Sequence, residues 1–309
     1  MGGCSGCRGL NRPGWSHDRG KKPLTAVTCS WRSTRQGTSP SAWHYLGMVQ
    51  NQQEYHYGEG IDYRHGSPHL THWRLHDALA GRLRRKIVQL SEGKRSLSVL
   101  EIGAGHGGFT EPTLAAGCKV TAVEMSRHSV AELEERFGAN DRFKVLYDSG
   151  GDLDSTGAGF DLVLAVAVLH HIPDYQSYLD RAITRLRPGG TLLTLQDPLW
   201  YPRHRAAHRL DRLGYLAWRT AQGDLSKGAA TLLRRARASY DETKPEDMVE
   251  YHVVRQGVDE DAVLTSLQPR FSRVAVVKYW SNQLALAQRL GDRLGAVNVF
   301  GIDASGYVG

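Results

Sequence analysis

The chain has 309 residues, of which 40% are hydrophobic and 23% charged, a composition typical of a globular protein with a sizeable core. No run of about 18 apolar residues occurs, which argues against a membrane-spanning helix, and the N-terminus lacks the apolar centre of a secretory signal. Of the net charge of +7, residues 1–47 account for +6, since they hold seven Lys or Arg and one acidic residue. The remainder is close to neutral, which argues against a basic nucleic-acid-binding body.

The leading segment, residues 1–47, is rich in Gly, Ser and Arg and has neither a helical nor a strand period, so we expect a disordered basic extension. Three of the four cysteines, Cys4, Cys7 and Cys29, lie in it, and Cys118 alone follows. One cysteine in the body argues against a disulfide framework and favours a reducing, cytoplasmic location. The spacing of the leading cysteines matches no common zinc pattern, so we expect no metal site.

Residues 48–94 are predicted to form a helical lid. Ser67-Pro68 has the pattern of a helix start, with Ser as the cap and Pro in the first turn. An apolar stripe that includes Trp73 extends this helix to about residue 92. We expect the lid to contribute an aromatic, partly polar pocket for the substrate, lined by Tyr55, Tyr57, Tyr63, His69 and Trp73. Simple packing of a covering helix explains Trp73 equally well.

From Ser98 onward, strand-like and helix-like segments alternate. This alternation is typical of a parallel sheet with helices on both faces, so the fold class is α/β. Ligands of such sheets bind beyond the carboxyl ends of the strands. The predicted strands cover residues 98–102, 119–124, 142–147, 160–166 and 190–196, and the predicted helices cover residues 108–116, 127–137 and 174–186. Ser126 and Asp174 are expected helix caps, and Arg187-Pro-Gly-Gly is expected to end the third helix.

Residues 198–270 interrupt the alternation and are predicted to insert two amphipathic, arginine-rich helices into a domain that spans residues 95–309. A strand at 271–280, a helix at 282–294 and a short strand at 296–302 complete the domain. The basic residues of the insertion indicate either an acidic acceptor or, more simply, a solvated helix face whose arginine stems cover apolar surface.

The first predicted strand leads into a glycine cluster. Glu101 stands near the end of the apolar run, and Gly103, Ala104 and Gly105 follow it. Glycine allows a sharp turn and a close approach of the backbone to a ligand, as in nucleotide-binding βαβ units. A carboxylate just before the turn repels a phosphate and suits a ligand with an ammonium or sulfonium group. An ordinary strand-to-helix turn with a solvated acid is the alternative.

Acidic residues also follow the next two predicted strands. Glu124 ends the second strand, where a carboxylate accepts hydrogen bonds from both ribose hydroxyls of an adenosine ligand. Met125 follows it and is suited to pack on an adenine face, or simply in the core. Asp148 and Ser149 follow the third strand, where a carboxylate accepts from the adenine amino group or forms a turn.

Two histidines, His170 and His171, follow the fourth predicted strand. Histidine is suited to proton transfer near neutral pH, and this pair stands at the edge of the sheet where ligands bind. The sequence therefore indicates a candidate general base, with packed or hydrogen-bonded histidines as the alternative.

Five motifs occur in order and resemble the signature of class I S-adenosylmethionine-dependent methyltransferases over residues 95–200. They are Glu-Ile-Gly-Ala-Gly-His-Gly, Ala-Val-Glu-Met, Tyr-Asp-Ser, Phe-Asp-Leu-Val-Leu with Leu-His-His-Ile-Pro-Asp, and Arg-Leu-Arg-Pro-Gly-Gly-Thr-Leu-Leu. The resemblance implies a Rossmann-like sheet of seven mostly parallel strands with an antiparallel last strand. It also implies S-adenosyl-L-methionine as the cofactor, with Glu101 and the glycines at its methionine end, Glu124 at the ribose, Asp148 at the adenine and backbone near Ala165 at the ammonium group.

Within this family, His-His-x-Pro-Asp with an acid after the fifth strand resembles the small-molecule branch, which includes sugar and natural-product O-methyltransferases. The resemblance implies that His170, His171 and Asp197 assist deprotonation of the acceptor. A hydroxyl has a high pKa and gains from a base, whereas an amine or an activated carbon needs it less. We therefore expect O-methylation of a hydroxyl or carboxylate of a secondary metabolite, with N- or C-methylation as the alternative.

Three other functions are kept as alternatives: an RNA methyltransferase that uses the basic tail and insertion, an NAD-dependent oxidoreductase, and a non-catalytic binding protein on the same scaffold. The acid before the glycines argues against NAD, and no Asn/Asp-Pro-Pro-Tyr/Phe motif of a base-directed amino-group methyltransferase follows the fourth strand. We expect a small-molecule acceptor as the partner, with neither membrane nor nucleic acid, and leave a homodimer open.

Overall fold

Seven strands form one mixed sheet in the order β3-β2-β1-β4-β5-β7-β6. The computed structural model describes residues 67–93, 96–148, 153–172, 174–221 and 256–309. Strands β1 to β5 run parallel, and β7 runs antiparallel to both of its neighbours, β5 and β6. The predicted α/β fold class, a Rossmann-like sheet of seven mostly parallel strands with an antiparallel last strand, is confirmed.

Strand and helix alternate along the chain up to β5, as predicted. The strands are β1 (Ser98–Ile102), β2 (Lys119–Glu124), β3 (Phe143–Tyr147), β4 (Phe160–Val166), β5 (Leu186–Pro198), β6 (Phe271–Tyr279) and β7 (Val299–Tyr307). The described α-helices are α3 (Pro68–Thr71), α4 (Trp73–Ser91), α5 (Thr110–Ala115), α6 (Arg127–Phe137), α7 (Tyr175–Ile183), α8 (Arg205–Ala221), α12 (Glu260–Leu267) and α13 (Ala285–Leu294). Short 3-10 turns are η1 (Asp154–Thr156), η2 (Leu169–His171) and η3 (Gln268–Arg270).

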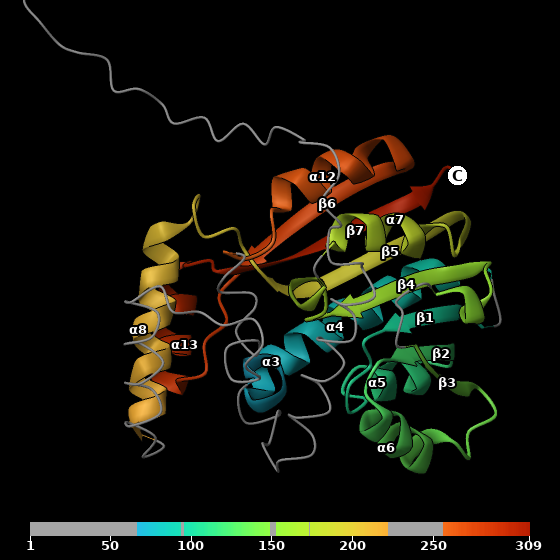
Figure 1. Ribbon diagram of the computed structural model, residues 1–309, viewed down its shortest axis with the longest axis horizontal. Coiled ribbons are helices and arrows are strands. Elements are labelled where there is room, and N and C mark those ends of the chain that lie inside the picture. The colour runs from blue at the N-terminus through green and yellow to red at the C-terminus, as the bar shows by residue number, and fades with distance from the viewer. Residues whose placement is uncertain (1–66, 94–95, 149–152, 173, 222–255) are drawn as a thin grey trace, which may run out of the picture. The chain divides into compact units, whose positions relative to one another are not determined.

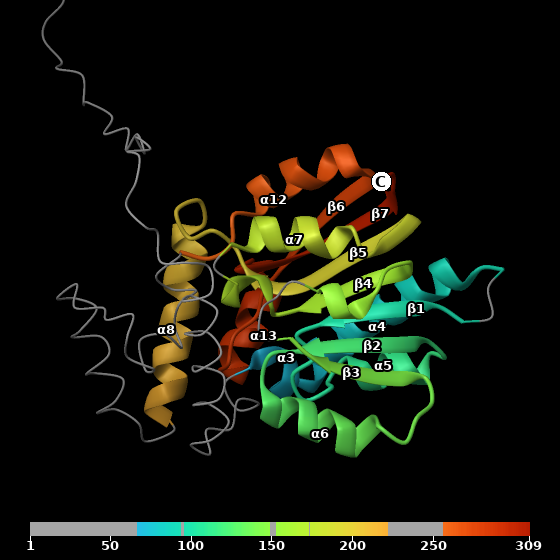
Figure 2. The same ribbon diagram turned by 45° about the vertical axis from the view of Figure 1, so that its right-hand side comes forward.

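Helices cover both faces of the sheet (Figures 1 and 2). Each face holds one hydrophobic cluster. Helices α7 and α12 pack on one face, where Leu179 and Val263 are buried together with Leu100 of β1. Helices α4, α5 and α6 pack on the other, where Leu83 is buried together with Val99. Neighbouring strand residues join opposite clusters because successive side chains of a strand point to opposite faces. Because β1 to β5 run parallel, their carboxyl ends meet at one edge of the sheet.

Both predicted caps are confirmed. The side chain of Ser126 accepts a hydrogen bond from the N–H of Ser129 at 3.3 Å, and α6 starts directly after it. The carboxylate of Asp174 accepts from the N–H of Ser177 at 3.1 Å at the start of α7. Each cap satisfies an N–H that has no partner within its helix, and so fixes where the chain turns back after β2 and β4.

The helix predicted over residues 67–92 is instead broken at His72, where the backbone is extended (φ −90°, ψ 97°). The Nε2 of His72 donates to the carbonyl oxygens of Asn282 and Gln283, at 2.8 and 2.9 Å, which holds the break in place. Trp73 is 71% exposed and does not belong to the buried stripe, contrary to expectation. Because α4 buries Leu83 against the sheet, this part of the predicted lid is a layer of the fold itself.

The predicted boundary between the third helix and the fifth strand is wrong. Helix α7 ends at Ile183, and Arg187-Pro-Gly-Gly lies within the opening of β5 rather than at a helix end. The ladder between β4 and β5 changes register between Phe160 and Leu162, opposite this segment. Such an irregularity accommodates a proline, which cannot donate to a regular ladder. Strand β7 also extends well beyond the short strand predicted at 296–302.

Helix α8 is one of the two helices predicted in the insertion, and the other falls on residues 222–255, outside the described part of the chain. The segment that leads into α8 is held by Glu260, whose side chain is 1% exposed and contacts Arg203, His204 and Lys278 at 2.9–3.0 Å. Burial alone raises the pKa of Glu260, but hydrogen bonds from His204, Lys278, a backbone N–H and Arg203 lower it to about 2. The carboxylate is therefore ionised and anchors α8 to α12 and β6.

Helix α8 lies beside α13 (Figure 2). The Nδ2 of Asn282, just ahead of α13, donates to Oδ1 of Asp211 in α8 at 2.7 Å. A Cβ on Gly214 would lie 2.6 Å from Oδ1 of the same asparagine, so only glycine permits this approach. Among the residues that the structure describes, no helix is both long and apolar enough to cross a membrane.

Substituting Gly291 should destabilise the fold, because a Cβ there would lie 2.3 Å from the buried indole of Trp280. We expect Gly291→Ala to lower the free energy of unfolding by about 1–3 kcal/mol, as other overpacked cores do. Urea denaturation followed by tryptophan fluorescence measures the change. Gly81→Ala in α4 is the matched control, since its Cβ would contact only flexible arginine ends, and should raise stability by about 0.5–1 kcal/mol. Equal effects of the two substitutions would contradict the packing described here.

Candidate active site

Glu101 lies buried near the end of β1, with 3% of its surface exposed. Its Oε2 accepts a hydrogen bond from Oγ1 of Thr110 at 2.7 Å. Burial raises the pKa of Glu101 to about 8, a shift that Thr110 opposes and the nearby Glu124 increases. Burial thus disfavours the carboxylate, and a cation bound beside it would favour ionisation again.

The loop after β1 turns through left-handed backbone at Gly103 (φ +65°) and Gly105 (φ +54°). A Cβ on Gly103 would lie 2.6 Å from Cγ2 of Val168, so the loop packs directly on the segment that follows β4. At Gly105 the same position is open, with no described atom within 4 Å. Ala104, between them, is buried. One glycine therefore permits packing, and the other leaves backbone accessible to a ligand.

Glu124 ties this loop to the start of α6. Its Oε2 accepts from the N–H of Gly105 at 2.9 Å, and its Oε1 accepts from the N–H groups of Met125 and Ser126 at 2.8 and 3.0 Å. Burial raises the pKa of Glu124, although the three backbone hydrogen bonds oppose the shift. A carboxylate oxygen with one hydrogen bond has a further lone pair, so Oε2 can still accept from a ribose hydroxyl. The predicted ribose contact stays a prediction.

The remaining predicted cofactor residues lie along the same edge. Asp148 follows β3; its N–H donates to the carbonyl of Glu124 at 3.0 Å, and its Oδ2 accepts from the N–H of Leu153 at 3.3 Å. It thus forms a turn, and its contact with the adenine stays a prediction. Ala165 is buried in β4 between Ile102 and Thr194 of the flanking strands. Met125 is half-buried, and Ser149 lies outside the described residues.

Asp197 and His170 are brought together from the ends of β5 and β4. Oδ1 of Asp197 accepts from the backbone N–H of His170 at 3.1 Å and from its ring Nδ1 at 2.9 Å. A carboxylate oxygen accepts, so Nδ1 of His170 donates to Asp197. The Asp197 side chain is fully buried and the His170 side chain is 12% exposed. The arrangement orients an imidazole so that Nε2 can take a proton.

The other two histidines of the predicted site lie close to this pair. The ring of His171 lies 4.0 Å from that of His170, centroid to centroid. His69 is buried and its ring stacks on Phe109 at 6.4 Å. Burial lowers the pKa of His69 to about 3, with further contributions from His170 and His76, so His69 is neutral near pH 7.

The predicted substrate residues are only partly accounted for. Tyr55, Tyr57 and Tyr63 lie outside the described part of the chain. Trp73 presents most of its ring on the surface, and His69 alone is buried near the histidine pair. Their contacts with an acceptor stay predictions. The described residues contain no group of three or more His, Cys, Asp or Glu side chains suited to a metal ion.

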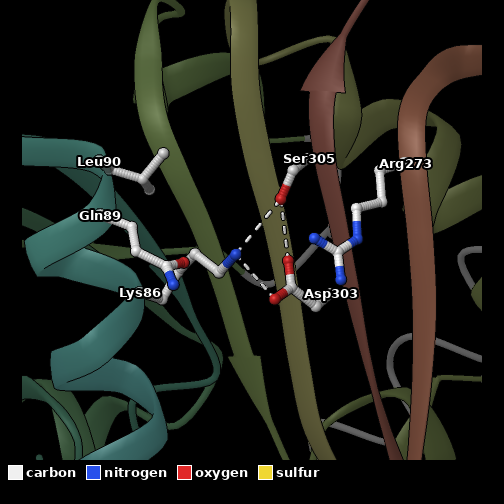
Figure 3. Close-up of a pocket in the computed structure, with 6 residues that line it drawn as sticks. All are labelled: Lys86, Gln89, Leu90, Arg273, Asp303 and Ser305. Carbon is white, nitrogen blue, oxygen red and sulfur yellow. Dashed lines mark hydrogen bonds and ion pairs between the residues drawn. The ribbon is translucent and has the colours of Figure 1, made fainter.

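A separate cavity of about 350 Å³ lies between α4 and the β6–β7 end of the sheet (Figure 3). Lys86 bridges Asp303 and Ser305 there, at 2.7 and 3.4 Å, and Arg273 points into the same space. Asp303 and Ser305 pair with Leu193 and Thr191, well before the carboxyl end of β5. This cavity is therefore distinct from the edge that carries Glu101, Glu124 and His170.

Four residues of the edge were not predicted from the sequence. Thr110 hydrogen-bonds Glu101, while Gln196, Tyr279 and Gly301 surround the backbone directly before Asp197. A glycine inside a strand pattern indicates a bulge or a close backbone approach, so Gly301 carried a usable signal. Gln196 and Tyr279 act through a contact between distant parts of the chain, which no local pattern reveals, whereas Thr110 lies nine residues after Glu101.

The described residues fit a sulfonium cofactor with an adenosine group. The open backbone at Gly105 leaves room beside the loop, and two buried acids, Glu101 and Glu124, make that place unfavourable for a phosphate and favourable for a cation. The sheet order, the left-handed glycine loop and the acids at the first two strand ends together define the edge of a class I methyltransferase.

A comparison with family models agrees: residues 74–226 match a family described as a methyltransferase domain. These residues therefore form a class I S-adenosylmethionine-dependent methyltransferase domain. The predicted class of enzyme and its cofactor, S-adenosyl-L-methionine, are confirmed.

The relatives differ in what they methylate. The chain is 35% identical over 136 residues to the 27-O-demethylrifamycin SV methyltransferase of Amycolatopsis mediterranei, covering 42% of this chain and 46% of that protein. It is 38% identical over 87 residues to the ribosomal RNA small subunit methyltransferase A of Synechococcus elongatus, covering 28% and 30%. The chain thus spans less than half the length of these curated relatives.

Solved structures that align with most of the chain include an N-methyltransferase. The N-methyltransferase NodS from Bradyrhizobium japonicum, in complex with S-adenosyl-L-homocysteine, is 15% identical, with 84% of this chain and 98% of that chain covered and a TM-score of 0.47. A similarity of this size indicates neither the acceptor nor the methylated atom.

Glu101→Gln should stabilise the protein in the absence of cofactor. The folded-state pKa of about 8 lies above the ordinary value of 4.5, so the protonated carboxyl contributes stability at low pH that is lost as the pH rises towards 8. Glutamine cannot ionise and keeps that contribution. We expect the gain in melting temperature over wild type to increase from about pH 5 to about pH 8, as thermal unfolding at several pH values would measure.

The exposed Glu135→Gln on α6 serves as the control and should show no such trend. A constant difference between Glu101→Gln and wild type across this range would contradict the raised pKa.

Proposed function

We propose that the protein transfers the methyl group of S-adenosylmethionine to a hydroxyl, or a carboxylate, of a small molecule, with His170 as the general base. The observation that carries this proposal is the pairing of His170 with Asp197, whose Oδ1 accepts from both the backbone N–H and Nδ1 of the histidine. Two hydrogen bonds to one buried carboxylate oxygen fix the ring orientation and its tautomer, and the proposal assigns the transferred proton to Nε2.

The preference for oxygen follows from acidity. A neutral alcohol is a poor nucleophile, and removal of its proton during transfer strengthens it, whereas an amine already carries a lone pair. A carboxylate acceptor would need no base and would gain instead from a cation. The name of the relative from Amycolatopsis mediterranei, which specifies a 27-O position, agrees with an oxygen acceptor.

The residues of the first two strands would hold the cofactor. S-Adenosylmethionine supplies an activated methyl group on a sulfonium, so the protein mainly has to align donor and acceptor and exclude water. Glu101 would face the methionine end, Glu124 would accept from the ribose and Asp148 from the adenine. His171 would contribute to the acceptor side by packing on His170, from which its ring lies 4.0 Å away.

Methylation of RNA is the second candidate, because one relative is named a ribosomal RNA methyltransferase and α8 presents Arg205 and Arg209 to solvent. Binding of a structured RNA that weakens steeply with salt would support it. Absence of such binding, with turnover of a small acceptor, would exclude it. N- or C-methylation of a small molecule is a further alternative for the reaction. A role in natural-product biosynthesis and a cytoplasmic location are also proposed for the protein.

Replacing the base should separate turnover from cofactor binding. We expect His170→Ala to lower kcat by about 10²–10⁴-fold, the usual contribution of a general base, with the dissociation constant for S-adenosylhomocysteine changed little. Asp197→Asn should also lower kcat, because it weakens the control of the tautomer. Turnover is assayed by screening candidate acceptors and measuring the release of S-adenosylhomocysteine. Calorimetry gives the dissociation constant for S-adenosylhomocysteine.

His128→Ala, an exposed histidine on α6, is the control and should behave as wild type. Equal losses of turnover and cofactor affinity in His170→Ala would assign the histidine to the cofactor site or to the fold instead.

A further inference from the structure

Strand β5 contains one extra residue directly before Asp197. In the ladder with β7, Thr194 pairs with Ile302 and Asp197 pairs with Phe300, so three steps along β5 correspond to two along β7. Such a bulge disrupts the ladder locally and redirects the side chains that follow it. Opposite the bulge stands Gly301, where a Cβ would lie 2.4 Å from the carbonyl oxygen of Thr194.

Gln196 lies within this bulge, is buried and has φ +68°. Left-handed backbone costs a residue other than glycine about 1 kcal/mol or more, and it persists only where the surroundings hold it. Two hydrogen bonds do so here. The N–H of Gln196 donates to Oη of Tyr279 at 2.7 Å, and its Nε2 donates to Oγ of Ser281 at 2.5 Å.

Both partners stand at the exit of β6, on the far side of β7 from the histidine pair. Burial raises the pKa of Tyr279, so its hydroxyl stays neutral and is available as the acceptor for the Gln196 N–H. The strained residue is thus fixed through both its main chain and its side chain. The next residue along the strand is Asp197, whose carboxylate orients His170.

We propose that Gln196 is a positioning residue, and that its clamp by Tyr279 and Ser281 sets the direction of the Asp197 carboxylate and thereby the orientation and tautomer of His170. The catalytic meaning of this link rests on the function proposed above, but the link itself is a property of the folded chain. The prediction is that removing a hydrogen bond of the clamp at β6 changes the orientation and the tautomer of the His170 imidazole at the end of β4.

The tautomer of the His170 imidazole reports on the clamp. The titratable groups that face its ring include Asp197 from β5, the adjacent His171 and His69 from α3. A correctly aligned Asp197 carboxylate accepts from Nδ1 and so holds the proton on that nitrogen. Misalignment of Asp197 therefore releases the restraint on the tautomer.

The test is Tyr279→Phe, which removes the oxygen that accepts the Gln196 N–H. Full-length protein labelled with ¹⁵N at histidine is titrated by NMR, with His170→Ala used to assign the His170 signals. We expect the ring of His170 to hold the proton on Nδ1 in the wild type and to populate both neutral tautomers in the variant. Tyr307→Phe, a buried tyrosine at the other end of the sheet, is the matched control and should leave the tautomer unchanged.

Ser281→Ala, which removes the acceptor of Gln196 Nε2, gives the same test if Tyr279→Phe does not fold; thermal unfolding identifies that case. A tautomer of His170 equal to that of the wild type in the folded variant would overturn the proposal. Full turnover in His170→Ala would overturn the proposed function but leave this link intact, since the link is read from the imidazole without any acceptor.

Discussion

The Glu124 carboxylate holds two separate segments of the ligand-binding edge, because its oxygens accept N–H groups from the loop after β1 and from the start of α6. Leaving a buried N–H without a partner costs about 1–3 kcal/mol, so this side chain helps to fix where the glycine loop lies, together with the backbone hydrogen bond from Gly103 to Val123. The loop in turn packs through Gly103 on Val168, which follows β4. The two halves of the candidate site are consequently connected by buried side chains that contact the backbone of the loop.

The edge combines two kinds of chemistry that the strand order keeps apart. Buried acids at the ends of β1 and β2 suit a cationic cofactor, while the Asp197–His170 pair at the ends of β5 and β4 suits removal of a proton. Methyl transfer from a sulfonium depends mainly on alignment, so rigid backbone at such an edge is an advantage. Ala167 and Gln196 both have left-handed backbone, the first three residues before His170 and the second directly before Asp197. The backbone is therefore strained near both members of the Asp197–His170 pair.

Residue patterns predicted the sheet well, because strands covered on both faces form continuous apolar runs and because the caps Ser126 and Asp174 act within one helical turn. They also predicted which acids and histidines share the edge, since the carboxyl ends of parallel strands meet there. They did not predict the break at His72 or the bulge at Gln196. Both depend on hydrogen bonds to residues of the β6–α13 region, far away in the sequence. The same limit explains why Trp73 was expected in a buried stripe.

The most direct test of the central claim is calorimetric titration of the full-length chain with S-adenosylmethionine, compared with Glu124→Gln. We expect one equivalent of cofactor to bind to the wild type and the variant to bind at least about ten-fold more weakly, because the amide NH₂ cannot replace a carboxylate oxygen that accepts from Gly105. NADH should not bind. Absence of S-adenosylmethionine binding to the folded wild type, or equal affinity of the variant, would contradict the account.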